Sequence, residues 1–158
     1  MQSIENDTQR ERRFKNIIFW RDSVAAGDDI NPRHERIIKI ESGETVESVL
    51  EKILSMHYLP SILGGKATWI VMGKSPLAVV AQQWSKPHFL VEPTTHIENL
   101  VELKDGHHLE FMYWCQVEPN KVVASIEQGK PLPDQYGRDE KSKMSVFARI
   151  RKWFSASS

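Results

Sequence analysis

The chain has 158 residues, of which 40% are hydrophobic and 27% charged, and its formal net charge is zero. This is the composition of one folded domain with a core, and it excludes a disordered chain. No uncharged apolar run is long enough to span a membrane, and a single cysteine, Cys115, excludes a disulfide framework or a zinc site built on cysteines. Residues 1–13 lack the apolar stretch of a signal peptide, so we expect a flexible N-terminus on a cytoplasmic protein.

Charge is distributed unevenly along the chain. Residues 16–137 carry a net charge of −5, whereas residues 138–158 carry six basic and two acidic side chains. An acidic body is a poor surface for nucleic acid, because phosphate binding needs clustered Lys and Arg. The body suits a basic protein partner better, and we expect no nucleic-acid partner.

Two short runs rich in β-branched and aromatic residues, 14–20 and 35–41, predict the first two strands. The polar segment between them contains Gly27 and the turn signal Asn31-Pro32, and it predicts a loop.

An amphipathic helix is predicted next, within residues 42–60. Thr45 or Ser42 can cap its N-terminus, and Pro60 stops it. One face of this helix gathers the residues at helical spacing, namely Val46, Val49, Leu50, Ile53 and His57.

Two hairpins are predicted after this helix. The first joins residues 62–73 to 77–84, and the second joins 96–103 to 107–115 across the Asp105-Gly106 turn. Apolar residues on both sides of the last of these strands indicate a central or doubly covered strand. A short helix with Pro119 in its first turn then closes an α+β domain over residues 14–133. We expect an antiparallel or mixed sheet of five to seven strands with helices packed on one face.

Residues 134–158 are predicted to be a linker followed by a C-terminal amphipathic helix. Val146, Phe147, Ile150, Trp153 and Phe154 share one side of this helix. It either packs on the domain, or binds a partner or a second copy in a homodimer, or lies on an anionic membrane surface, as basic amphipathic helices do.

The candidate site is the loop between the first two strands. It holds four carboxylates and one histidine, namely Asp22, Asp28, Asp29, His34 and Glu35. These residues lack the spacing of a known metal loop, so three interpretations stay open: a solvated structural loop, a partner-binding loop, and a metal or catalytic site. We favour no metal and no catalytic residue, and we expect carboxylates that pair with Arg and Lys of a partner.

Other chemically suggestive residues favour structural roles. Cys115 alternates with core residues on a predicted strand, which is typical of an inert buried thiol. His107 and His108 are adjacent on an extended chain and point opposite ways, so they do not share one metal. The glycines of Gly64–Lys66 have the wrong spacing for a phosphate-binding loop and predict a turn. No cofactor is expected.

Four segments in order, FKNIIFWRDSVAAGDD, PRHERIIKI, YLPSILGGKATWIV and PLAVVAQQW, resemble the small α+β immunity proteins of bacteria. Such proteins protect a cell against its own contact-dependent growth inhibition or polymorphic toxins. The resemblance covers residues 14–130 and implies a role, the capture of a cognate toxin domain, but no site residues. We therefore expect a non-enzymatic toxin inhibitor that binds through an acidic loop and aromatic anchors. The alternative is a small enzyme or metal-binding domain whose site joins residues 22–35 to a histidine.

Overall fold

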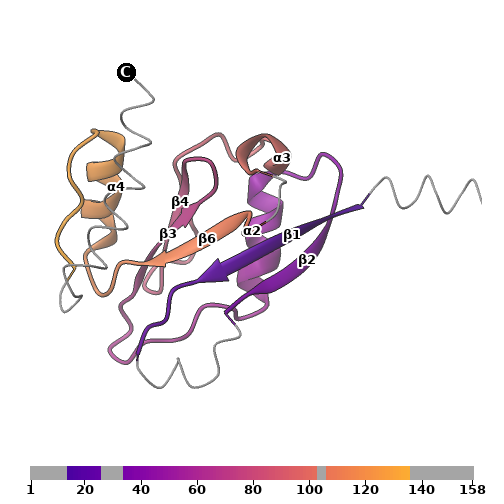
Figure 1. Cartoon of the computed structure of the whole chain (residues 1–158). Helices are drawn as coiled ribbons and strands as arrows, with labels where there is room; N and C mark the ends of the chain where they lie inside the picture. The colour runs from indigo at the N-terminus through magenta and orange to yellow at the C-terminus, as the bar shows by residue number, and fades with distance from the viewer. Residues whose placement is uncertain (1–13, 26–33, 103–105, 136–158) are drawn as a thin grey trace, which may run out of the picture.

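The computed structural model describes residues 14–25, 34–102 and 106–135. In this part of the chain, six strands form one mixed sheet in the order β2-β1-β6-β3-β4-β5, accompanied by three helices (Figure 1). The strands are β1 Phe14–Arg21, β2 Arg36–Glu41, β3 Thr68–Met72, β4 Pro76–Ala81, β5 His88–Phe89 and β6 Leu109–Tyr113. The helices are α2 Val46–Ser55, α3 Ile97–Leu100 and α4 Pro119–Glu127. The predicted α+β class and a sheet of five to seven strands are confirmed.

β6 lies in the middle of the sheet, although it is the last of the described strands in chain order. It pairs in parallel with β1, where Phe19 lies opposite Leu109, and antiparallel with β3, where Ile70 lies opposite Met112. The prediction of a central strand here is therefore confirmed. The hairpin of β3 and β4 is also confirmed, because the two strands pair directly and antiparallel.

The second predicted hairpin is wrong. The described residues of its first arm, 96–102, contain no strand but the short helix α3. The backbone N–H of Ile97 donates to the carbonyl of Glu44 at 2.9 Å. Ile97 in the first turn of α3 and Val101 just beyond its end are both buried in the core that contains the residues of α2. Packing against the start of α2 thus overrides the extended conformation that the sequence favours.

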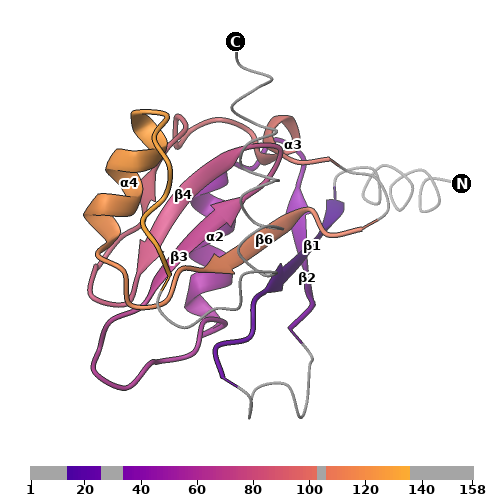
Figure 2. The same cartoon turned by 60° about the vertical axis from the view of Figure 1, so that its left-hand side comes forward.

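Two hydrophobic cores lie on opposite faces of the sheet, because successive strand residues point to opposite sides. α2 and α3 pack on the first face, whose buried residues include Ile17, Phe19, Trp69, Val71, Phe111 and Tyr113. α4 packs on the second face, whose buried residues include Ile70, Met72, Val79, Met112 and Trp114. The sheet thus lies between α2 and α4 (Figure 2). The expectation that helices share one face is wrong for α4, because the central strands are apolar on both sides.

The chain stays packed on the second face after α4. Leu132 is buried in that core, the indole N–H of Trp114 donates to the carbonyl of Pro133 at 3.0 Å, and the Gln135 amide donates to the carbonyl of Tyr113 at 2.9 Å. Packing therefore reaches Gln135, two residues into the predicted linker. The predicted flexible residues 1–13 and C-terminal helix 141–154 lie outside the described residues.

α2 begins as predicted and ends earlier than predicted. The side chain of Thr45 caps it by accepting from the N–H of Ser48. The helix ends at Ser55, and His57 has φ 52° and is exposed. The prediction that His57 lies on the apolar helix face is therefore wrong.

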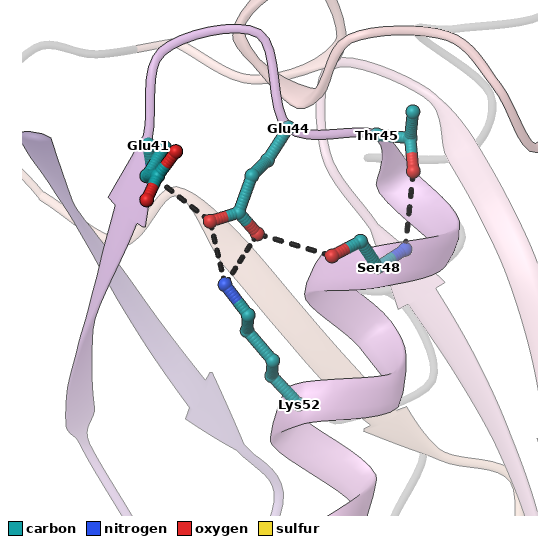
Figure 3. A network of polar contacts seen from close by, with 5 residues as sticks. All are labelled: Glu41, Glu44, Thr45, Ser48 and Lys52. Carbon is teal, nitrogen blue, oxygen red and sulfur yellow. Dashed lines mark hydrogen bonds and ion pairs between the residues drawn. The ribbon is translucent and has the colours of Figure 1, made fainter. Parts of the chain in front are cut away.

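The turn from β2 into α2 is held by the carboxylate of Glu44. This carboxylate accepts from the backbone N–H of Glu41 at 2.8 Å, from the Ser48 hydroxyl at 3.1 Å and from the ammonium of Lys52 at 2.5 and 2.6 Å (Figure 3). Burial raises the pKa of Glu44. The hydrogen bonds and the charge of Lys52, together with the hydrogen bonds from the Glu41 backbone and the Ser48 hydroxyl, outweigh burial and hold this pKa below its usual 4.5.

We expect Glu44→Gln to lower stability at neutral pH and to matter progressively less in acid. A carboxyl whose pKa is lower in the folded state stabilises the fold above its unfolded pKa, and this contribution is lost as the pH falls through the folded pKa. Urea unfolding of both proteins between pH 3 and 7 measures the effect. The exposed Glu47 of the same helix serves as control, because Glu47→Gln removes a carboxylate without this network. A gap between Glu44→Gln and the unaltered chain that persists unchanged at pH 3 contradicts the assignment.

Candidate functional site

The loop between β1 and β2 is anchored to the sheet on both sides. Residues 22–25 and 34–35, its two stems, are described, whereas the predicted site residues Asp28 and Asp29 lie outside the described residues. Asp22, Ser23, His34 and Glu35 each make a side-chain contact at these stems.

Asp22 continues the parallel pairing of β1 with β6. Its N–H donates to the carbonyl of Phe111 at 3.0 Å, and its carboxylate oxygen Oδ2 accepts from the N–H of Tyr113 at 2.9 Å. The side chain thus occupies the position of a strand carbonyl, and its partly buried carboxylate has a structural task.

His34 joins the second stem to the first stem and to the end of α2. Only 5% of His34 is exposed, its Nε2 lies 3.0 Å from the Ser23 hydroxyl, and the Tyr58 hydroxyl donates to its carbonyl. Burial raises the pKa of the Tyr58 phenol, against the opposing effect of Arg21 and Arg36. The phenol is therefore protonated at neutral pH and remains a donor.

Glu35 is exposed and reaches towards the segment before β6. Its Oε2 lies 2.7 Å from Nε2 of His107, whose ring stacks on Trp20 with centroids 5.9 Å apart. The neighbouring His108 accepts from the backbone N–H of Ile18 at 2.9 Å through Nδ1. The two histidines thus have different partners.

A pocket of about 180 Å³ opens beside these stems. It is lined by Arg21, Arg36, Met56, His57 and Tyr58. The Arg21 guanidinium donates to the carbonyl of Asp22 at 3.0 Å and lies 5.9 Å from the centre of the Tyr58 ring, a cation–π distance. Two guanidinium groups beside an aromatic ring make a cationic pocket suited to a carboxylate.

The sequence did not point to this pocket. Arg21 ends β1, Arg36 begins β2 and Tyr58 follows α2, and only the folded chain brings them together. One feature of the sequence could have indicated the pocket: Arg21 and Arg36 stand at the two ends of the loop between the paired strands β1 and β2.

Two exposed apolar side chains lie in segments near this end of the sheet. Met56 lines the pocket, and Leu63 precedes β3, whose first residues pair with the end of β6. Met56 is 48% exposed, and Leu63 is 96% exposed in the turn before β3, where Gly64 and Gly65 adopt positive φ. The predicted glycine turn is therefore present, and it presents Leu63 to solvent.

Two further observations bear on chemistry. Among residues 14–25, 34–102 and 106–135, no group of three or more His, Cys, Asp or Glu side chains is placed to hold a metal ion. Cys115 lies beyond the end of β6 with φ 55°, half-buried against the first core, rather than on the strand as predicted.

In the same described ranges, no helix has the length and apolar character needed to cross a membrane. Comparisons with protein families, curated proteins and solved structures find no match to this chain.

Proposed function

We propose that this chain is a non-enzymatic binding protein that neutralises a cognate toxin domain, in the manner of an immunity protein. The observation that carries the proposal is the anchored base of the 22–35 loop, where Asp22 and His34 fix both stems beside a pocket with two arginines. Fixing the stems before binding lowers the ordering cost that a partner-binding loop otherwise has.

The surface at this end of the sheet has the composition of a protein interface. Arg and Tyr, which line the pocket, are the residue types that dominate binding energy in interfaces, and Leu63 and Met56 supply apolar contact area. Acidic residues on the loop and arginines at its base select a partner with the opposite arrangement of charges.

The proposal predicts that a neighbouring gene encodes a secreted protein with a variable C-terminal toxin domain, and the test is protection against that domain. Co-expression is expected to restore growth, and the purified proteins are expected to form a one-to-one complex by calorimetry. Three substitutions probe the loop and the pocket, namely Asp28→Ala, Asp29→Ala and Arg36→Ala. We expect at least one of them to weaken binding by about 2 kcal/mol or more, as the loss of a hot spot does. Glu47→Ala and Lys74→Ala, which change exposed charges at other places on the molecule, serve as matched controls.

Two results would contradict the proposal. One is a complex that none of the three loop and pocket substitutions weakens, which would place the interface elsewhere. The other is the absence of protection and of binding by the unaltered chain.

A second candidate function rests on the Ser23–His34 pair. A hydroxyl 3.0 Å from an imidazole nitrogen is within the reach required of a nucleophile and its base. The Ser23–His34 pair is therefore the observation that favours the alternative of a small enzyme. If the pair is catalytic, the purified chain labels with a fluorophosphonate and hydrolyses activated esters, and Ser23→Ala abolishes both. If the pair only ties the stems, neither reaction occurs and Ser23→Ala costs about 1 kcal/mol of stability.

A further inference from the structure

Part of the second face of the sheet extends beyond the core under α4. The register places Ile18 of β1 opposite Ile37 of β2, and their neighbours Ile17 and Phe19 belong to the first core. Ile18, Trp20 and Ile37 therefore point to the face that α4 occupies, and we refer to these three residues as the outer patch. Ile37 is 60% exposed, and Ile18 and Trp20 are half-buried.

α4 does not account for this patch. The core beneath α4 draws its strand residues from β3, β4 and β6. α4 packs mainly against β4, which lies two strands away from β6 on the side opposite β1. The outer patch lies on β1 and β2, on the other side of β6.

The described chain ends next to the outer patch and on the same face. Leu132 is buried in the second core, and Gln135 donates to the carbonyl of Tyr113 at the end of β6. β1 is the neighbour of β6, and Trp20 lies opposite Glu110 in their register. Gln135 thus reaches the strand next to β1, about 10 Å along β6 from the position opposite Trp20 and one strand spacing of about 4.8 Å across.

The sequence that follows has the pattern required to cover such a patch. Its apolar residues, Val146, Phe147, Ile150, Trp153 and Phe154, recur at the spacing of one helix side. A helix over residues 141–154 is about 21 Å long and matches a strand such as β1, at about 26 Å. Residues 136–140 supply the connection.

Charge also favours this match. Residues 138–158 carry six basic and two acidic side chains. Glu41 and Glu110 lie on the same face as the outer patch, with Lys39 between Ile37 and Glu41. A basic segment is therefore attracted to this half of the sheet more than to the region around Arg21 and Arg36.

We propose that the C-terminal segment, residues 141–154, docks its apolar side on the outer patch and completes the second layer of the sheet beside α4. In this arrangement Phe147 and Trp153 are internal contacts of the domain. They are then withheld from a membrane surface, from a second copy and from the partner that the loop end binds.

A double-mutant cycle in the full-length chain tests the proposal. Phe147→Ala with Trp153→Ala forms one arm, and Trp20→Ala forms the other, with the unfolding equilibrium measured in urea. Each variant raises the unfolding equilibrium constant by some factor. If the two sites touch, the factor for the combined variant is about fivefold smaller than the product of the factors for the two arms. Leu63→Ala replaces Trp20→Ala in the control cycle and is expected to give independent effects, because its neighbour Ile62 packs against the first core, on the opposite face of the sheet from the outer patch. Ile37→Ala substitutes for Trp20→Ala if the latter does not fold.

Three outcomes overturn the proposal. Independent effects in the Trp20 and Ile37 cycles show that the tail lies elsewhere. A coupling that disappears on dilution, together with a dimer in sedimentation, assigns the patch to a second copy. Binding of the chain to phosphatidylserine vesicles that is lost in the tail variant, with independent effects in both cycles, assigns the tail to a membrane surface.

Discussion

Gly73→Ala is expected to destabilise the protein by about 2–3 kcal/mol, the upper part of the range for overpacking a tightly filled site. A Cβ at Gly73 would lie 2.4 Å from the carbonyl oxygen of Leu100 and 3.0 Å from a methyl group of Leu77. The oxygen cannot move freely, because it belongs to the backbone and accepts from the N–H of Lys74 at 2.8 Å. The turn between β3 and β4 would therefore have to separate from the end of α3.

The measurement is urea unfolding of the Gly73→Ala variant at neutral pH. Ser75→Ala, in the same turn, is the matched control, because the bond from the N–H of Gly73 to the carbonyl of Ser75 uses only backbone atoms. We expect the control to lie within about 0.5 kcal/mol of the unaltered protein. Equal stabilities for the two variants would mean that the turn and α3 are not packed together as described.

Asp22→Ala is expected to cost about 2 kcal/mol, because it removes a charged acceptor from a partly buried backbone N–H, that of Tyr113. Asp22→Asn keeps an oxygen at this position and is expected to retain most of the stability. Thermal and urea unfolding of the three proteins give the comparison.

The two variants Asp22→Ala and Asp22→Asn also distinguish a structural role of Asp22 from a role in binding a partner. If Asp22 contacts a partner through its charge, Asp22→Asn weakens the complex while the fold remains stable. If Asp22 acts only as a substitute strand carbonyl, Asp22→Asn binds normally and Asp22→Ala loses stability. Alanine and asparagine variants of equal stability would contradict the structural assignment.

Local patterns in the sequence identified most elements of the fold. The spacing of Val46, Val49, Leu50 and Ile53 predicted α2, the hydroxyl of Thr45 its cap, and the Gly73–Pro76 connection the hairpin of β3 and β4. Each of these signals depends on neighbours in sequence, and such signals survive without knowledge of the tertiary fold.

The elements that were wrong depend on distant contacts. Residues 97–100 are helical because Ile97 packs with α2 and bonds to Glu44. α4 packs on the face that carries Met112 and Trp114. These residues alternate with equally apolar neighbours, so the sequence does not indicate which face of the strand a helix covers. A pattern of apolar residues on both sides of a strand is compatible with helices on one face or on two.

Part of the candidate site could likewise be predicted from local patterns, and the rest depends on distant contacts. Sequence composition identified the 22–35 loop as the unusual polar segment, and the structure places Asp22, His34 and Glu35 at its base. It does not bring these three into one constellation, since each has a different partner. Arg21, Arg36 and Tyr58 meet only through the pairing of β1 with β2 and the packing of α2, which no local pattern encodes.

The parallel pair of β1 with β6 has a consequence for how the molecule acquires its shape. Ile18 bonds to His108, 90 residues later, and the Asp22–Tyr113 bond spans 91. The β1–β2 and β3–β4 pairs can each form from nearby segments, but they join into one sheet only when β6 inserts between them. Because such distant contacts have a high entropic cost of loop closure, we expect this insertion to be the slow step of folding. During synthesis, the two strand pairs can join into one sheet only after β6 has left the ribosome.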